Sequence, residues 1–208
     1  MMNLPKLILA SASPRRSEIL TAVGWEFEKH SADIDETELP DENPADYVQR
    51  LAKEKAEAVA ANYENALVLG ADTTVVIERQ IIGKPKDFDD ARRMLQMLSG
   101  NWHEVLTGVA LVKKSELTAQ TNGLNPKSKI QNPKSVVGIQ KTKVKFAKMN
   151  DAQIEFLIEK GEPLDKAGAY AVQAQAALFI EQIQGDYWNV VGLPVSLVYE
   201  LLIGVTQE

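Results

Sequence analysis

Cysteine is absent from this 208-residue sequence, and histidine occurs only twice, as His30 and His103. The absence of cysteine excludes disulfides, thiolate metal sites and a cysteine nucleophile. Two histidines are too few for a histidine-rich zinc site, so we expect any bound metal to be a hard cation on oxygen ligands, such as Mg²⁺ or Mn²⁺. No Gly-x-Ser-x-Gly elbow is present, which argues against a serine hydrolase.

Long apolar runs and an excess of positive charge are also missing. No uninterrupted apolar stretch is long enough to span a bilayer. The apolar run before Ala10-Ser11-Ala12 is too short for a signal peptide, so we expect a cytoplasmic protein with no membrane partner. The formal net charge is −6, so nucleic acid is not an expected partner. A polyanionic substrate would require a local cluster of cations.

Strand and helix patterns alternate along the chain, which predicts one α/β domain over residues 1–208. The predicted strands are 7–10, 25–30, 66–71, 74–77, 80–82, 102–113, 136–148 and 178–183, and the predicted helices begin at Pro14 and span 43–63, 88–98, 150–160 and 194–203. The polar segment 115–135 contains Asn-Pro-Lys-Ser twice. We interpret it as a hairpin insertion, mobile and without catalytic importance.

The start of the first helix is the first candidate site. Ser13 can cap this helix, and Pro14 fits its first turn. Free N–H groups at a helix N-terminus bind anions, whereas Arg15 and Arg16 oppose the helix dipole there. This conflict disappears if both arginines face a bound polyanion. The alternative, solvated arginines after an ordinary strand–turn–helix connection, is the commoner case.

Three further positions attract attention. Lys55 falls on the apolar face of the predicted long helix, where a lysine either extends to solvent or meets a buried anion. Asp72 follows the apolar strand 66–71 directly, at the edge where ligands of open α/β sheets bind. The acidic segment 31–43 is typical of a solvated loop, but Ile34-Asp35-Glu36 offers two carboxylates to a divalent cation.

Six separated motifs occur in a fixed order along the chain. They are Ala10-Ser11-Ala12-Ser13-Pro14-Arg15-Arg16, Gly70-Ala71-Asp72-Thr73, Ile81-Ile82-Gly83-Lys84-Pro85, Leu98-Ser99-Gly100, Asp165-Lys166-Ala167-Gly168-Ala169-Tyr170 and Val190-Val191-Gly192-Leu193-Pro194. Together they resemble the Maf family of nucleoside triphosphate pyrophosphatases over nearly the whole chain except the insertion. The resemblance implies a strongly bent mixed β-sheet flanked by helices. It also implies two lobes around a central cleft, as in inosine-triphosphate pyrophosphatases.

The resemblance implies hydrolysis of a nucleoside triphosphate to the monophosphate and pyrophosphate, with a divalent cation. It is also compatible with a homodimer. Arg15, Thr73 and Gln173 match the positions that separate a dTTP/UTP branch from a 7-methyl-GTP branch, and they favour dTTP and UTP. The glutamine amide offers a donor and an acceptor to the O4/N3–H edge of uracil or thymine. The glycines that the family usually shows around this glutamine are replaced here by Ala171 and Ala174.

Asp72 matches the general base of the family, and it would activate water for in-line attack on the α-phosphorus. Glu36, with Asp35 beside it, and Asp72 would hold the cation. The phosphates would be bound by Ser11, Ser13, Arg16, Lys55, Lys84 and Lys166, with Arg15 neutralising charge on the leaving pyrophosphate. Two alternatives stay open. One is a broad-specificity house-cleaning pyrophosphatase, and the other is a non-catalytic nucleotide-binding regulator of cell division.

Overall fold

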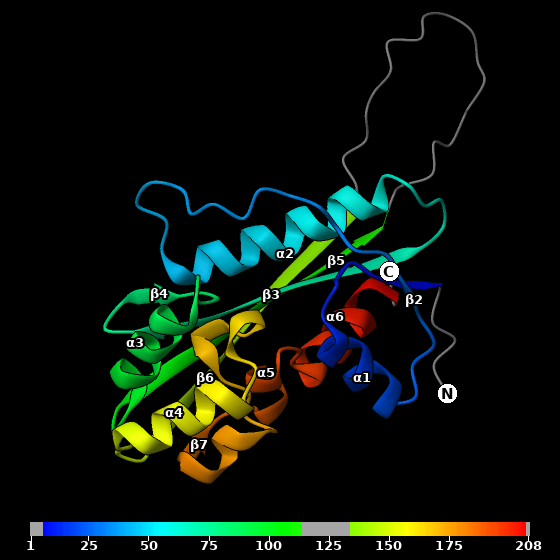
Figure 1. The fold of residues 1–208 in the computed structure, drawn as a ribbon. Helices are drawn as coiled ribbons and strands as arrows, with labels where there is room; N and C mark the ends of the chain where they lie inside the picture. The colour runs from blue at the N-terminus through cyan, green and yellow to red at the C-terminus, as the bar shows by residue number, and fades with distance from the viewer. Residues whose placement is uncertain (1–5, 114–133, 207–208) are drawn as a thin grey trace, which may run out of the picture.

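The computed structural model describes residues 6–113 and 134–206, and its strands form one mixed sheet flanked by helices (Figure 1). The strands are β1 (Leu7–Leu9), β2 (Glu28–Lys29), β3 (Leu67–Ile77), β4 (Gln80–Ile82), β5 (Trp102–Lys113), β6 (Lys134–Phe146) and β7 (Ile180–Gln184). Their order is β2-β1-β3-β5-β6-β7, and β4 pairs with β3. Strand β1 runs parallel to both neighbours, and the other pairs are antiparallel. The expected α/β fold with a mixed sheet is confirmed.

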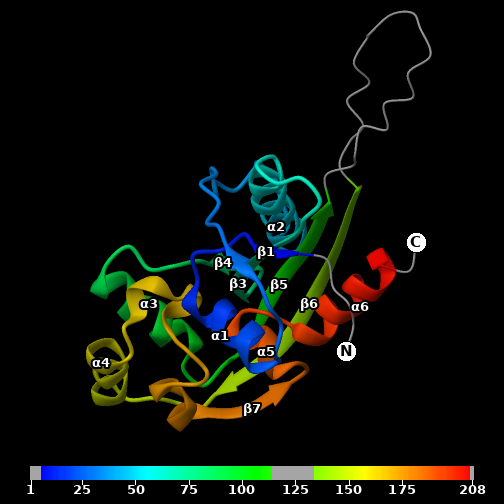
Figure 2. The same cartoon turned by 90° about the vertical axis from the view of Figure 1, so that its right-hand side faces the viewer.

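Helices lie on both faces of this sheet (Figures 1 and 2). Helix α2 (Pro44–Ala60) covers one face of β3 and β5. The other helices are α1 (Pro14–Ala22), α3 (Phe88–Leu98), α4 (Asp151–Lys160), α5 (Tyr187–Val191) and α6 (Val195–Thr206), with short 3-10 turns η1 (Pro163–Asp165), η2 (Ala167–Ala169) and η3 (Gln175–Phe179) before β7. The larger hydrophobic core cluster lies between the sheet and the helices opposite α2, and a smaller cluster lies between α2 and the strands.

Capping residues account for several element boundaries that the sequence predicts. The Asn43 side chain accepts hydrogen bonds from two main-chain N–H groups at the start of α2. Asn150 forms a capping box with Gln153 at the start of α4. Gly100, with φ of 71°, follows the end of α3. These boundaries are therefore encoded locally, and the corresponding predictions are confirmed.

Other predictions are wrong in extent. The strand expected at 25–30 is only Glu28–Lys29, because β1 pairs with just these two residues. Helix α5 was not predicted. The hairpin insertion expected at 115–135 lies mostly outside the described residues, and Lys134 and Ser135 already belong to β6, paired with Lys113 and Val112.

The largest correction concerns β3, which continues through Asp72 to Ile77 instead of ending before it. Strand β5 pairs with one edge of β3 from Leu67 to Val76. On the other edge, β1 pairs only with 67–69 and β4 only with 75–77. Between them, residues 70–74 have no strand neighbour on this edge within the described parts of the chain. Asp72 therefore sits mid-strand, yet beside a gap in the sheet.

Two strand glycines allow α2 to lie close to this gap. A Cβ atom on Gly70 would lie 2.1 Å from the main-chain oxygen of Ala52, and one on Gly108 would lie 2.1 Å from that of Val48. Gly70 lies two residues before Asp72, and Gly108 pairs with Asp72 across the strands, so all three share one face. The close approach lowers α2 onto this face and brings Lys55 within reach of Asp72.

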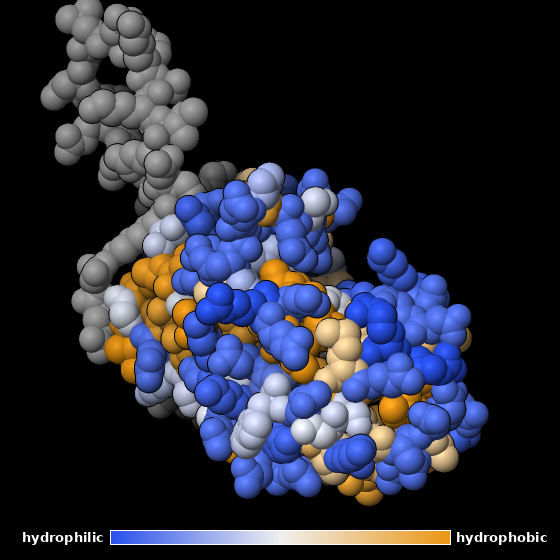
Figure 3. All heavy atoms as spheres, turned by 90° about the vertical axis from the view of Figure 1, so that its left-hand side faces the viewer, coloured by the Kyte–Doolittle hydropathy of each residue, from blue (hydrophilic) through white to orange (hydrophobic). Residues whose placement is uncertain are grey.

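The surface seen from the left of Figure 1 is mainly hydrophilic, with hydrophobic side chains gathered in patches between polar ones (Figure 3). Charged residues make up 25% of the sequence, and their alternation with apolar groups on this face is ordinary for a folded domain. None of the helices in the described ranges is long and apolar enough to cross a membrane.

Candidate active site

A cleft of about 500 Å³ lies at the open edge of β3. It is bounded by the start of α1, the middle of β3, the loop after β4, the segment before η3 and the end of α5. The predicted site residues other than Asp35 line it: Ser11, Ser13, Arg15, Arg16, Glu36, Lys55, Asp72, Thr73, Lys84, Lys166 and Gln173. The fold thus gathers into one cavity residues that are more than 150 positions apart in the sequence.

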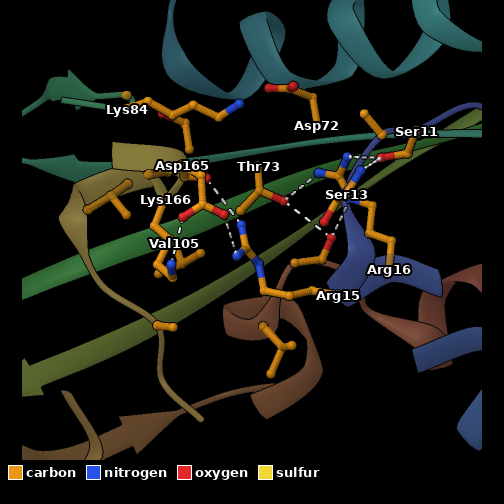
Figure 4. A pocket seen from close by; sticks show the side chains of 18 of the residues that line it. Ser11, Ser13, Arg15, Arg16, Asp72, Thr73, Lys84, Val105, Asp165 and Lys166 are labelled. Carbon is orange, nitrogen blue, oxygen red and sulfur yellow. Dashed lines mark hydrogen bonds and ion pairs between the residues drawn. The ribbon is translucent and has the colours of Figure 1, made fainter. Parts of the chain in front are cut away.

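Neighbouring residues of β3 enter this cleft from opposite faces of the sheet. Asp72 points toward α2, whereas Thr73 points the other way, toward Arg15 and Arg16 (Figure 4). Successive side chains of a strand alternate between faces, and both can reach one cavity only because the strand edge between them is open. The cleft therefore wraps around the exposed edge of β3.

On the α2 face, Asp72 is only 8% exposed. The Lys55 ammonium lies 2.6 Å from Asp72 Oδ1 and 2.7 Å from Glu36 Oε1. Burial raises the pKa of Asp72 above its usual range, and the charges of Lys55 and Arg16 offset this effect in part. Of the two alternatives for Lys55, contact with a buried anion is the one observed.

The carboxylates of Asp72 and Glu36 both contact the Lys55 ammonium, which lies between them. Two converging carboxylates that leave room for substrate oxygens suit Mg²⁺, which is usually bound by one or two carboxylates plus phosphate and water. Asp35 does not line the cleft, and its carboxylate accepts hydrogen bonds from Thr37 instead. Among residues 6–113 and 134–206, no group of three or more metal-binding side chains occurs. The residues present therefore fit a cation that the substrate helps to bind.

On the opposite face, Arg16 is buried among neutral acceptors. Its Nε donates to the carbonyl of Gly192 at 2.9 Å, Nη1 to Ser11 Oγ at 3.0 Å, and Nη2 to Thr73 Oγ1 at 3.1 Å. Burial lowers the pKa of Arg16, with the charge of Asp72 acting in the opposite sense. No ion pair joins Arg16 to a carboxylate within the described ranges. A buried guanidinium without a carboxylate is a strong binding site for an anion.

Arg15 is paired differently, although it is adjacent in sequence. Its guanidinium donates to Asp165 Oδ2 at 3.1 Å and to the main-chain oxygen of Asp165 at 3.2 Å. Lys166 also contacts Asp165, at 2.6 Å. Burial opposes the ionisation of Asp165, but hydrogen bonds from Lys166 and Arg15 prevail and lower its pKa. Sequence analysis did not assign Asp165 a role, although its place beside Lys166 in a shared motif was a signal. Lys84 is exposed and extends over the cleft (Figure 4).

Ser11 and Ser13 lie just before α1, and Ser11 accepts hydrogen bonds from a main-chain N–H group and from an arginine. Ser11 Oγ accepts from Arg16 and also from the N–H of Ser13, at 3.2 Å. Ser13 is the N-cap residue of α1, as expected, but its side chain makes no capping hydrogen bond, so that part of the prediction is wrong. The helix end thus remains uncapped by this side chain where it faces the cleft, and phosphate binding by both serines stays a prediction.

The segment that carries Gln173 is anchored to β5 by a buried contact between two side chains. Tyr170 OH lies 2.8 Å from Nε2 of buried His103, whose pKa burial lowers to about 4. Gln173 is exposed and lines the cleft, and base reading by it and by Thr73 stays a prediction. Left-handed backbone occurs at residues 168 and 169, and not at Ala171 or Ala174. The two alanines that replace family glycines therefore carry no such strain.

An α/β sheet with a polar cleft at a gap between its strands is a common framework for nucleotide-binding enzymes. The family model of the Maf-like proteins matches residues 6–205, and the chain belongs to this family. It is 46% identical over 200 residues to a protein of Hahella chejuensis named dTTP/UTP pyrophosphatase, covering 95% of this chain and 90% of the relative. A protein of Pseudoalteromonas atlantica with the same name is 48% identical over 200 residues, covering 94% and 95%. The structure titled "The structure of the Staphylococcus aureus Ham1 protein" is similar at a TM-score of 0.45 with 12% identity, covering 68% of this chain and 72% of that one.

Proposed function

We propose that this protein hydrolyses dTTP and UTP to the nucleoside monophosphate and pyrophosphate, with Asp72 as the general base. One observation carries the proposal. Asp72 and Arg16 lie on opposite sides of one open strand edge, so a base and an anion site face the same cavity. Both relatives described above, which cover nearly the whole chain, are named for this activity.

The proposed reaction requires in-line attack of water on the α-phosphorus. Asp72 accepts the proton of that water, and its raised pKa brings its basicity closer to neutral pH than that of an ordinary aspartate. Arg16 binds the polyphosphate from the opposite side of β3, and Lys84 and Arg15, which line the same cleft, are more exposed than Arg16. Charge that develops on the leaving pyrophosphate thus moves toward fixed cations.

A divalent cation is part of the proposal, and Asp72 and Glu36 are the residues that would hold it. When bound, it would polarise the phosphate oxygens and lower the pKa of a coordinated water molecule. Lys55 joins these two carboxylates and keeps their mutual repulsion small until a cation arrives. The oxygen-only donor set predicts a preference for Mg²⁺ or Mn²⁺ over Zn²⁺.

Two further activities are compatible with the same cavity. A broad-specificity house-cleaning pyrophosphatase would use the same general base and the same cationic side chains, with a pocket that is less selective for the nucleobase. The exposed Gln173 is the observation behind this alternative, because no hydrogen-bond partner among the described residues fixes its amide in one orientation. A non-catalytic regulator of cell division would bind the nucleotide without turnover, and the buried Asp72 gives no advantage to such a protein. A homodimer and a cytoplasmic location stay predictions.

The test is pyrophosphate release from a panel of triphosphates with Mg²⁺ or Mn²⁺. The panel contains dTTP, UTP, CTP, ITP, 7-methyl-GTP and the standard purine triphosphates. Turnover led by dTTP and UTP is the expected result. Similar rates with every nucleobase would replace the dTTP/UTP proposal by the house-cleaning activity. Tight binding without turnover would favour the regulator.

A further inference from the structure

Behind the cleft, a row of hydrogen-bonded side chains leads from Arg16 into the sheet. Arg16 Nη2 donates to Thr73 Oγ1, which lies 2.9 Å from Thr107 Oγ1 on β5. Thr73 and Thr107 are direct partners across the two strands. Thr107 is fully buried and does not line the cleft, so it can influence a bound substrate only through other residues, and Thr73 contacts both Thr107 and Arg16.

The number of hydroxyl protons limits how this row is connected. Thr73 can donate to the carbonyl of Gly192 at 3.3 Å, and Thr107 can donate to the carbonyl of Asn189 at 3.4 Å or to Thr73. The shorter contacts favour Thr107 donating to Thr73, and Thr73 then donating to Gly192. In this arrangement the Thr73 oxygen accepts from Thr107 and Arg16 and donates once, which uses its full capacity.

The carbonyl of Gly192 is therefore a second point at which the row reaches Arg16. It accepts from Arg16 Nε at 2.9 Å as well as from Thr73. Its position depends on α5, which Asn189 fixes by donating from Nδ2 to the main-chain oxygen of Val105 at 2.9 Å and to Thr142 Oγ1 at 3.0 Å. Gly192 itself has φ of 126°, a conformation that favours glycine, and turns the chain where α5 ends.

We propose that Thr107 is a positioning residue, which fixes the Arg16 guanidinium through Thr73 and thereby sets how tightly the cleft binds polyphosphate. The electrostatic reason is that the charge of Asp72 attracts Arg16. Neutral acceptors hold the Arg16 guanidinium on the side of β3 opposite to Asp72. Arg16 therefore stays available to bind phosphate, and Asp72 stays available to accept a proton from water. The inference rests on the proposed function, because it takes the polyanion to be the triphosphate of the substrate.

The test compares Thr107→Val, which removes the hydroxyl at nearly constant shape, with Thr107→Ser, which keeps it. Binding of inorganic tripolyphosphate is measured by calorimetry, and kcat and KM are measured with dTTP. Thr107→Val should weaken tripolyphosphate binding about tenfold and raise KM more than it lowers kcat. Thr107→Ser should restore binding to within about twofold of the wild type. Thr107→Ala replaces the valine variant if the latter does not fold.

A double-mutant cycle separates positioning from a general structural role. If Thr107 acts through Arg16, then Thr107→Val should change tripolyphosphate binding little in an Arg16→Met background. An equal loss in both backgrounds, or a serine variant as weak as the valine one, would overturn the proposal. So would a wild-type protein that does not bind tripolyphosphate. A wild type that binds it but hydrolyses no nucleotide would remove the proposed function and leave the test of Thr107 intact.

Discussion

The two sides of the open β3 edge differ in how their charges are compensated. On the α2 side, Asp72 and Glu36 share the ammonium of Lys55. On the α1 side, the acceptors of the Arg16 guanidinium among the described residues are hydroxyl and carbonyl groups. The first side has one negative charge in excess and is completed by a proton or a cation, whereas the second has an uncompensated positive charge and is completed by an added anion.

This difference shows how one cavity can hold a base and a phosphate site close together without neutralising either. A strand alternates its side chains between the two faces of a sheet, so Asp72 and Thr73 diverge although they are adjacent. The gap between β1 and β4 then opens both faces to the same solvent space. The four predictions below test this separation, from the largest expected effect to the smallest.

Asp72→Asn should have the largest effect. We expect a loss of turnover of about 10²- to 10⁴-fold, the range typical of a missing general base. Because the pKa of Asp72 is raised in the folded state, the ionised carboxylate costs stability at neutral pH, and asparagine should not lower the melting temperature. Pyrophosphate release and thermal unfolding measure both effects. Turnover near the wild-type rate in a folded variant would exclude Asp72 as the base.

Arg16→Met and Arg15→Met compare two adjacent cations with different partners. The loss of Arg16 should reduce kcat/KM for dTTP about 100-fold, because a buried charged donor to phosphate disappears. The loss of Arg15 should cost less, since Asp165 already compensates much of its charge. Steady-state kinetics with dTTP give both values. A larger loss for Arg15 than for Arg16 would contradict the assignment of the anion site to the α1 side.

Gly108→Ala should disturb the contact between α2 and the sheet. The added methyl group would lie 2.1 Å from the main-chain oxygen of Val48, so α2 must move outward. We expect a loss of about 1 to 3 kcal/mol in the free energy of unfolding, measured by urea denaturation. Gly83→Ala provides the control, because a Cβ atom there meets nothing within 4 Å. Equal stability of the two variants would show that α2 does not depend on the small residue.

Lys55→Met should change the pH dependence of the reaction. Asp72 acts in its ionised form, so activity is lost as the pH falls through its pKa. Lys55 lowers this pKa, and its removal should therefore move the acidic limb of kcat/KM upward by about one pH unit. Lys53→Met on the exposed side of α2 is the matched control, since Lys53 pairs only with Glu57 in the described chain. If the acidic limb of the kcat/KM profile does not move, Lys55 does not influence the pKa of Asp72.

Local sequence predicted the elements where a few neighbouring residues determine the outcome. The caps Asn43 and Asn150 fixed the starts of α2 and α4, and the strands predicted at 74–77 and 80–82 pair as the β3–β4 hairpin around Glu78 and Arg79. Helix α5 is only five residues long, too short for a periodic pattern, and was missed. The end of β3 was misplaced because Asp72 and Thr73 look like the end of an apolar strand, although pairing with β5 continues past them.

The sequence by itself determined the inventory of the site: Asp72, the cations and the ordered motifs by which the chain resembles the Maf family. Local patterns could not show that Arg15 is bound to Asp165 while Arg16 is bound to neutral groups. That distinction depends on contacts between distant segments, 150 positions apart for Arg15 and Asp165 and 176 for Arg16 and Gly192. Tertiary structure alone decided it, by leaving the middle of one strand edge open and by placing α2, α1 and α5 around it.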